Sequence, residues 1–176
     1  LSAAWLVKAM ARYAVAPDML QGIVLTHEHT DHTCGAYTLS RKFGVPLIAN
    51  FATLSCLMDS KRECAHEALA TGSRMGFGQL SVETFPVPHD AAEPVGISVM
   101  AGGLKVSIIT DAGCVTPEMR SSVSGSDLLI VEANHDVHRL KAGSYPPALK
   151  MRILSDKGHL SNETSVDLIT DHVLKK

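Results

Sequence analysis

Short apolar segments rich in β-branched residues recur along the chain and predict buried strands. The clearest of these cover residues 22–26, 46–49 and 128–131. Each is a brief, continuous apolar run rather than an alternating one, which is typical of a strand covered on both faces. Strands of this kind are most common in α/β proteins.

A second group of segments alternates apolar and polar positions and predicts an antiparallel meander. Residues 80–87 and 95–101 have this pattern, and Gly102-Gly103 offers a tight hairpin turn into residues 104–110. The last of these strands leads directly to Asp111, so a carboxylate is expected at the end of a buried strand.

Helical spacing separates the strands. In residues 3–14, for example, Trp5, Leu6, Met10 and Tyr13 recur at the period of an amphipathic helix. Thr116-Pro117-Glu118 has the residues that favour a helix start. Further helices are expected at residues 35–43, 51–58, 148–154 and 162–174. This alternation of helices and strands predicts an α/β fold.

Composition narrows the class of protein. The chain has 176 residues, 45% of them hydrophobic, which predicts a single domain over residues 1–176. The net charge is −2 without a basic run, so no electrostatic surface for nucleic acid or membrane is indicated. No apolar run is long enough to cross a bilayer, and four cysteines without paired spacing favour a reducing cytoplasm.

The sequence His27-Glu28-His29-Thr30-Asp31-His32 follows the first predicted strand and has the composition of a metal site. Along an extended chain end, His27 and His29 point to the same side and can reach one ion, while Glu28 points away. Asp31 and His32 then turn into a helix and can reach a second ion. The alternative is a solvated polar loop, which the preceding apolar strand argues against.

Three further candidate ligands stand where a strand ends or a loop turns. His89 follows the stiff segment Phe85-Pro86-Val87-Pro88, and the adjacent Asp90 could orient its ring. Asp111 would be costly to bury unpaired, and two cations would resolve that cost. His159 stands before the last helix. The alternative for His89 is a histidine in a surface loop, and the alternative for Asp111 is a helix N-cap. His159 could instead be a loop or capping residue.

These residues and their order along the chain resemble the metallo-β-lactamase superfamily, whose pattern is HxHxDH followed by His, Asp and His. The resemblance implies an αββα sandwich that contains a dinuclear metal site. It also implies that His27, His29 and His89 hold one ion, that Asp31, His32 and His159 hold the other, and that Asp111 bridges them.

Longer segments are similar to one branch of that superfamily, the WalJ-like (YycJ-like) metallo-hydrolases and exonucleases. They are SRKFGVPLIA, PHDAAEPVG around His89, EANHD after a strand, and KGHLSN around His159. Members of this group begin with strands ahead of Leu1 and continue beyond Lys176. The resemblance therefore implies a fragment that is incomplete at its N- and C-terminal strands.

The expected function is that of a metal-dependent hydrolase that uses a metal-activated hydroxide, and the expected class is a phosphodiesterase or nuclease. Two divalent ions, two aspartates and a hydroxide leave about +1 at the centre, which suits an anionic phosphodiester or nucleic acid. Zinc fits the donors best, and manganese or iron is possible. We expect Asp31 and His135 to be catalytic, with His135 binding phosphate or protonating the leaving oxygen.

Alternatives remain at this level. His135 can equally be a helix-cap or loop residue paired with Asp136. A thioester or lactam hydrolase of the glyoxalase II or β-lactamase type would use the same metal core. A non-catalytic metal-binding module would need only the ligands.

Overall fold

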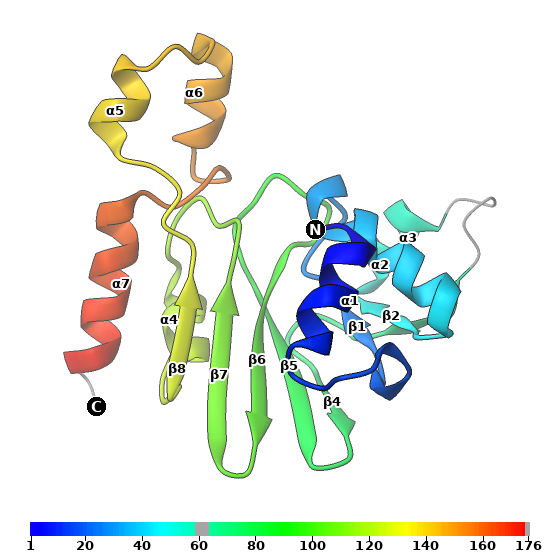
Figure 1. The fold of residues 1–176 in the computed structure, drawn as a ribbon. Helices are drawn as coiled ribbons and strands as arrows, with labels where there is room; N and C mark the ends of the chain where they lie inside the picture. Colours follow the sequence, from blue (N-terminus) through cyan, green and yellow to red (C-terminus); the bar gives the residue numbers. More distant parts are fainter. Residues whose placement is uncertain (59–63, 175–176) are drawn as a thin grey trace. The chain divides into compact units, whose positions relative to one another are not determined.

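A computed structural model describes residues 1–58 and 64–174, and the chain divides into two compact units (Figure 1). Unit 1 comprises Leu1–Ala70 and Ala91–Glu93. Unit 2 comprises Thr71–Asp90 and Pro94–Lys176. Each unit has its own sheet and its own cluster of buried apolar side chains.

Unit 1 contains a three-stranded parallel sheet in the order β1-β2-β3. The strands are β1 (Ile23–Val24), β2 (Leu47–Ala49) and β3 (His66–Ala68), and the helices α2 (Thr30–Phe43) and α3 (Phe51–Leu57) connect them. The central strand β2 is wholly buried, as its continuous apolar sequence predicts. Leu25, at the end of β1, packs in the same core as Tyr37 of α2 and Leu54 of α3.

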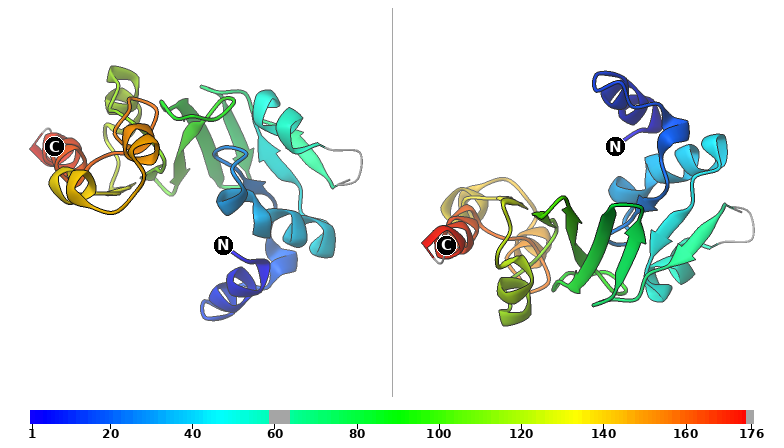
Figure 2. Two further views of the ribbon diagram at one scale, coloured as in Figure 1. Left: turned by 90° about the horizontal axis from the view of Figure 1, so that it is seen from above. Right: turned by 90° about the horizontal axis from the view of Figure 1, so that it is seen from below.

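The N-terminal helix α1 (Ala3–Ala11) lies beside α2, and a short 3₁₀ helix, η1 (Pro17–Met19), follows it (Figure 2). Gly35 allows this close approach, because a Cβ atom there would collide with the carbonyl oxygen of Leu1. The predicted apolar stripe is only partly used: Trp5 is 55% exposed, and Tyr13 lies beyond the end of the helix.

Unit 2 contains a five-stranded sheet in the order β4-β5-β6-β7-β8. Its strands are β4 (Arg74–Phe77), β5 (Leu80–Pro86), β6 (Val95–Ala101), β7 (Leu104–Ile109) and β8 (Leu128–Val131). The first four strands run antiparallel, and β8 is parallel to β7 after a crossover through α4 (Pro117–Val123). Gly102 and Gly103 both have positive φ, as the predicted hairpin turn between β6 and β7 requires.

Helices complete unit 2. Helix α4 packs against one face of the sheet at β5 and β6, and it also contacts α7 (Asn162–Leu174) (Figure 2). The core between them includes Phe85, Ile109, Met119 and Leu168. Helices α5 (Val137–Ala142) and α6 (Pro147–Ile153) lie beyond the C-terminal ends of β7 and β8 (Figure 1).

The α/β class predicted from the sequence is confirmed, and the predicted strands are present with bounds shifted by a few residues. One helix boundary is wrong, since α2 begins at Thr30 rather than at residue 35. Strands β3 and β4 and helix α5 were not predicted. Within the described residues, no helix combines the length and apolar character needed to cross a bilayer.

Candidate metal centre

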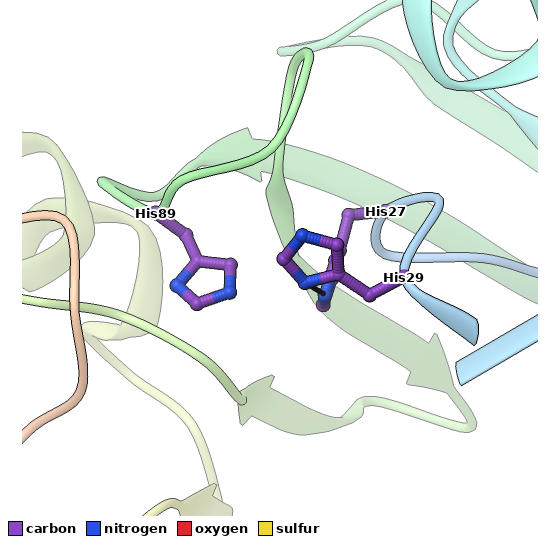
Figure 3. A group of neighbouring side chains, drawn as sticks. All are labelled: His27, His29 and His89. Atoms are coloured by element: carbon purple, nitrogen blue, oxygen red, sulfur yellow. Dashed lines mark hydrogen bonds between the residues drawn. The ribbon is translucent and has the colours of Figure 1, made fainter. Parts of the chain in front are cut away.

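Two histidines of unit 1 lie side by side immediately after β1. His27 is only 1% exposed, and its Nε2 atom lies 3.1 Å from Nδ1 of His29 (Figure 3). Two nitrogen ligands of a tetrahedral zinc ion, with bonds of about 2.0–2.1 Å, stand about 3.3 Å apart. The hydroxyl of Thr26, 3.0 Å from Nδ1 of His27, fixes the ring from the other side. The pair therefore has the spacing of two ligands on one ion.

Asp31 and His32 belong to the first turn of α2, for which His29 is the N-cap residue. The ring of His32 is 4.2 Å from the ring of His27, so three imidazoles of unit 1 gather in one place. The carboxylate of Asp31 is 81% exposed, and its Oδ2 atom is 3.4 Å from Nε2 of His32. Asp31 thus stands at the edge of this histidine group rather than within it.

Glu28 is directed toward a different partner, as its alternate position in the motif predicts. Its Oε1 atom accepts a 2.8 Å hydrogen bond from the backbone N–H of Ala92, which also belongs to unit 1. The side chain of Asn50 donates to the carbonyl oxygen of Glu93 and holds the same segment. Glu28 therefore has a structural role beside the histidines.

A second group of side chains that could hold a metal ion forms within unit 2. Donor atoms of His89, Asp111 and His159 all lie within 4.8 Å of one another. His89 is in the loop after β5, Asp111 follows β7, and His159 is in the loop between α6 and α7. The fold therefore brings together three residues that are separated by 22 and 48 positions in the sequence (111 − 89 and 159 − 111).

The ring of His89 is held in the orientation that a metal ligand needs. This side chain is buried, and its Nδ1–H donates a 2.9 Å hydrogen bond to the carbonyl oxygen of Gly158. Because a carbonyl only accepts, a neutral His89 has its lone pair on Nε2, the atom with which the ring would bind a cation. Nε2 lies 3.2 Å from Oδ1 of Asp90, a carboxylate that also pairs with Arg152. Figure 3 shows His89 projecting from its loop.

Asp111 has a backbone conformation that few residues adopt. Its φ angle is +50°, in the left-handed region, which aspartate tolerates better than most residues with a side chain. Such strained positions are concentrated at functional sites. The turn directs the carboxylate toward His159, whose Nδ1 atom is 3.2 Å from Oδ1 of Asp111.

His159 is held between two carboxylates. Its Nδ1–H donates to Oε2 of Glu132 at 3.0 Å and also faces Asp111. These contacts, Asp111 first and Glu132 second, raise the pKa of His159 from 6.5 to about 9, although burial opposes the shift. Without a metal ion, this imidazole is therefore protonated at neutral pH. Because Nδ1 is engaged, Nε2 is the atom available to a cation after deprotonation.

Glu132 is a site residue that sequence reasoning did not assign a role. It follows β8, and its Oε1 atom accepts hydrogen bonds from the backbone N–H groups of Ala112 and Leu160. One carboxylate thus connects the residue after Asp111, the residue after His159 and the His159 ring itself. The signal available in the sequence was an acidic residue at the end of a buried strand, in the segment EANHD.

His135 lies in the loop that follows β8. Its backbone forms a parallel bridge with Ser161, and its carbonyl oxygen accepts from the N–H of Asn162. Burial is the largest cause that lowers the pKa of His135, and the positive charge of His159 adds to the effect. Its Nδ1 atom is buried without a hydrogen-bond partner among the described residues. Asp136, rather than His135, is the N-cap residue of α5.

Comparison with known proteins identifies the family. The model of the β-lactamase superfamily domain matches residues 5–173. The chain is 38% identical over 159 residues to exodeoxyribonuclease YycJ of Bacillus anthracis. The alignment covers 86% of this chain and 60% of that protein. It is 37% identical over 172 residues to exodeoxyribonuclease WalJ of Streptococcus pneumoniae serotype 2, and this alignment covers 95% of this chain and 64% of WalJ. The chain therefore spans less than two thirds of the length of these relatives.

Among solved structures, the metallo-β-lactamase fold protein YhfI from Bacillus subtilis superimposes with a TM-score of 0.73 at 16% identity. The match covers 98% of this chain and 68% of YhfI, and at this identity it shows a common fold. The predicted resemblance is thus confirmed: the chain belongs to the metallo-β-lactamase superfamily and is YycJ-like.

Proposed function

We propose that the protein is a metal-dependent phosphodiesterase of the nuclease type. The observation that carries this proposal is the convergence of His89, Asp111 and His159, with ring orientations set by Gly158 and Glu132. Imidazole and carboxylate donors fixed in this way are the usual ligands of catalytic zinc. The two relatives named exodeoxyribonucleases support nucleic acid as the substrate class.

The proposed ligand set is the one implied by the sequence motifs. By the family resemblance, His27, His29 and His89 would hold one ion and Asp31, His32 and His159 a second, with Asp111 as a ligand shared by both. In this proposal units 1 and 2 are parts of one domain, a view supported by the single family model that spans both.

The protein side chains prepare the site in three ways. The carbonyl of Gly158 fixes the tautomer of His89, and Glu132 orients His159. The charges of Asp31 and Asp111 offset only part of the charge of two divalent cations, so an anionic phosphodiester is attracted. When bound, the cations lower the pKa of water and so provide the nucleophile.

We assign catalytic roles to Asp31 and His135. Asp31 contributes as a ligand at the accessible edge of the site, as its exposure suggests. His135 binds a phosphate oxygen or protonates the leaving oxygen. Burial lowers the pKa of His135, which disfavours the protonated ring that the second role needs.

The metal is assigned from the chemistry of the donor atoms, and the cellular compartment from the state of the cysteines. Zinc suits the histidine-rich donor set best, and manganese or iron are the alternatives. We place the protein in the cytoplasm, because all four cysteines are free thiols.

A substrate panel tests the proposal. Zinc- and manganese-loaded protein is assayed with a single-stranded DNA oligonucleotide, an RNA oligonucleotide, nitrocefin and a thioester, with Asp111→Asn as the inactive variant. We expect phosphodiester cleavage that falls at least 100-fold in Asp111→Asn. Hydrolysis of nitrocefin or the thioester without phosphodiester cleavage would contradict the proposal. Metal binding without any turnover would indicate a non-catalytic module instead.

A further inference from the structure

Unit 2 contains a cavity at the start of α5 that no predicted metal ligand lines. It has a volume of about 490 Å³, within the range of about 300–1,000 Å³ typical of small-molecule sites. Its lining includes Asn134, His135, Arg139, Tyr145 and Asn162. These residues come from the loop after β8, from α5 with the loop that follows it, and from the first residue of α7 (Figure 1).

Backbone hydrogen bonds join this cavity to the metal-binding group of unit 2. The N–H of Asn134 donates to the carbonyl oxygen of Leu160, and the N–H of Asn162 donates to that of His135. Leu160 directly follows His159, and Asn134 is two residues after Glu132, which holds the His159 ring. The cavity wall is therefore continuous with the segments that position His159.

The side chains that line the cavity suit a nucleotide. Arg139 is exposed, and its guanidinium has no ion-pair partner among the described residues. The one acidic residue of the lining, Asp136, has its Oδ1 atom occupied as the N-cap of α5, where it accepts from the backbone N–H of Arg139. Tyr145 is 56% exposed and offers an aromatic face, and the amides of Asn134 and Asn162 can both donate and accept.

We infer that this cavity binds one nucleotide of a single-stranded nucleic acid next to the phosphodiester that is cleaved. Arg139 pairs with a phosphate of that nucleotide, and Tyr145 stacks on its base. Stacking on an aromatic side chain tolerates every base, so this contact would bind a nucleotide of any sequence. This inference rests on the proposed function, and it adds a substrate-binding residue pair outside the metal ligands.

The test compares Tyr145→Ala and Arg139→Gln with two matched controls in unit 1, Tyr13→Ala and Arg12→Gln, which are exposed positions outside both sites. Binding of a fluorescein-labelled oligothymidylate is measured by anisotropy in EDTA, so that no strand is cut. Tyr145→Ala should raise the Kd about 5- to 100-fold. Arg139→Gln should raise it as well and reduce the slope of log K against log salt by about 0.7. The controls should bind like the unaltered protein.

Kinetics of the zinc-loaded protein separate this inference from the proposed function. In Tyr145→Ala, kcat/KM for the oligonucleotide should fall about 5- to 100-fold further than kcat/KM for methyl 4-nitrophenyl phosphate, which has no base. Kd values within twofold of the unaltered protein for both Tyr145→Ala and Arg139→Gln would overturn the inference, even if the protein cleaves phosphodiesters. Loss of oligonucleotide binding in these variants, in a protein without phosphodiesterase activity, would support the cavity and overturn the proposed function.

Discussion

The Nδ1 atom of His159 lies 3.0 Å from Oε2 of Glu132. Asp111 faces the same nitrogen, and the two carboxylates raise the pKa of His159 to about 9. In the metal-free protein the folded state therefore binds a proton more tightly than the unfolded chain does. The resulting stabilisation is complete below pH 6.5 or so, and it is lost as the pH rises through about 9.

This relationship predicts a pH-dependent effect of replacing His159. In EDTA, His159→Gln should lower the free energy of unfolding. The decrease should be larger at about pH 6 than at about pH 9.5. Urea unfolding at both pH values measures the two differences. His138→Gln, at an exposed position of α5, is the control and should show no such trend. An equal gap at both pH values would exclude a raised pKa for His159.

A second prediction concerns proton release when zinc binds. Because His159 is protonated at pH 7 without metal, zinc must displace a proton before Nε2 can coordinate it. Calorimetric titrations in buffers of different ionisation enthalpy count the protons released per chain. His159→Gln should release about one proton fewer at pH 7, and the difference should shrink toward pH 9 and above. The same proton count for both proteins would show that His159 does not bind the ion.

Glu132 provides a third prediction, because it holds the His159 ring without being a proposed ligand. Glu132→Gln removes the charge that favours the Nδ1–H of His159, and zinc affinity should fall about 10- to 100-fold. Competition with a chromogenic chelator measures the affinity. Glu118→Gln, at an exposed position of α4, is the matched control in the same unit. Unchanged affinity in Glu132→Gln would mean that zinc binding does not depend on the contact between Glu132 and His159.

The fold was predictable wherever apolar periodicity is strong. The buried strand β2 and the meander of β5, β6 and β7 were found because their side chains pack on a core. Strand β3 was missed because all three of its residues are exposed, so no apolar pattern marks it. Helix α2 was predicted to begin too late because its first turn, Thr30 to Thr33, is polar.

The candidate site was predictable where ligands are adjacent in sequence. His27, His29 and His32 stand within one short motif, and local geometry alone brings their rings together. The role of Glu132 depends on the ends of β7 and β8 meeting the loop before α7, a tertiary arrangement that spacing does not reveal. The cavity beside α5 was equally hidden, because that helix has six residues and too few turns for a period to emerge.

The carbonyl oxygen of Gly158 is the acceptor that orients His89, and the position itself tolerates no side chain. A Cβ atom there would collide with the carbonyl oxygens of Arg152 and Ile153 at the end of α6. Gly158→Ala should therefore move this loop and destabilise the protein by about 1–3 kcal/mol. It should also weaken zinc binding, because the Nδ1–H of His89 loses its acceptor. Gly76 has open space around its Cβ direction and no positive φ, so Gly76→Ala is the matched control. Chemical denaturation of both variants checks the prediction, and equal stability of the two would show that the loop adapts without strain.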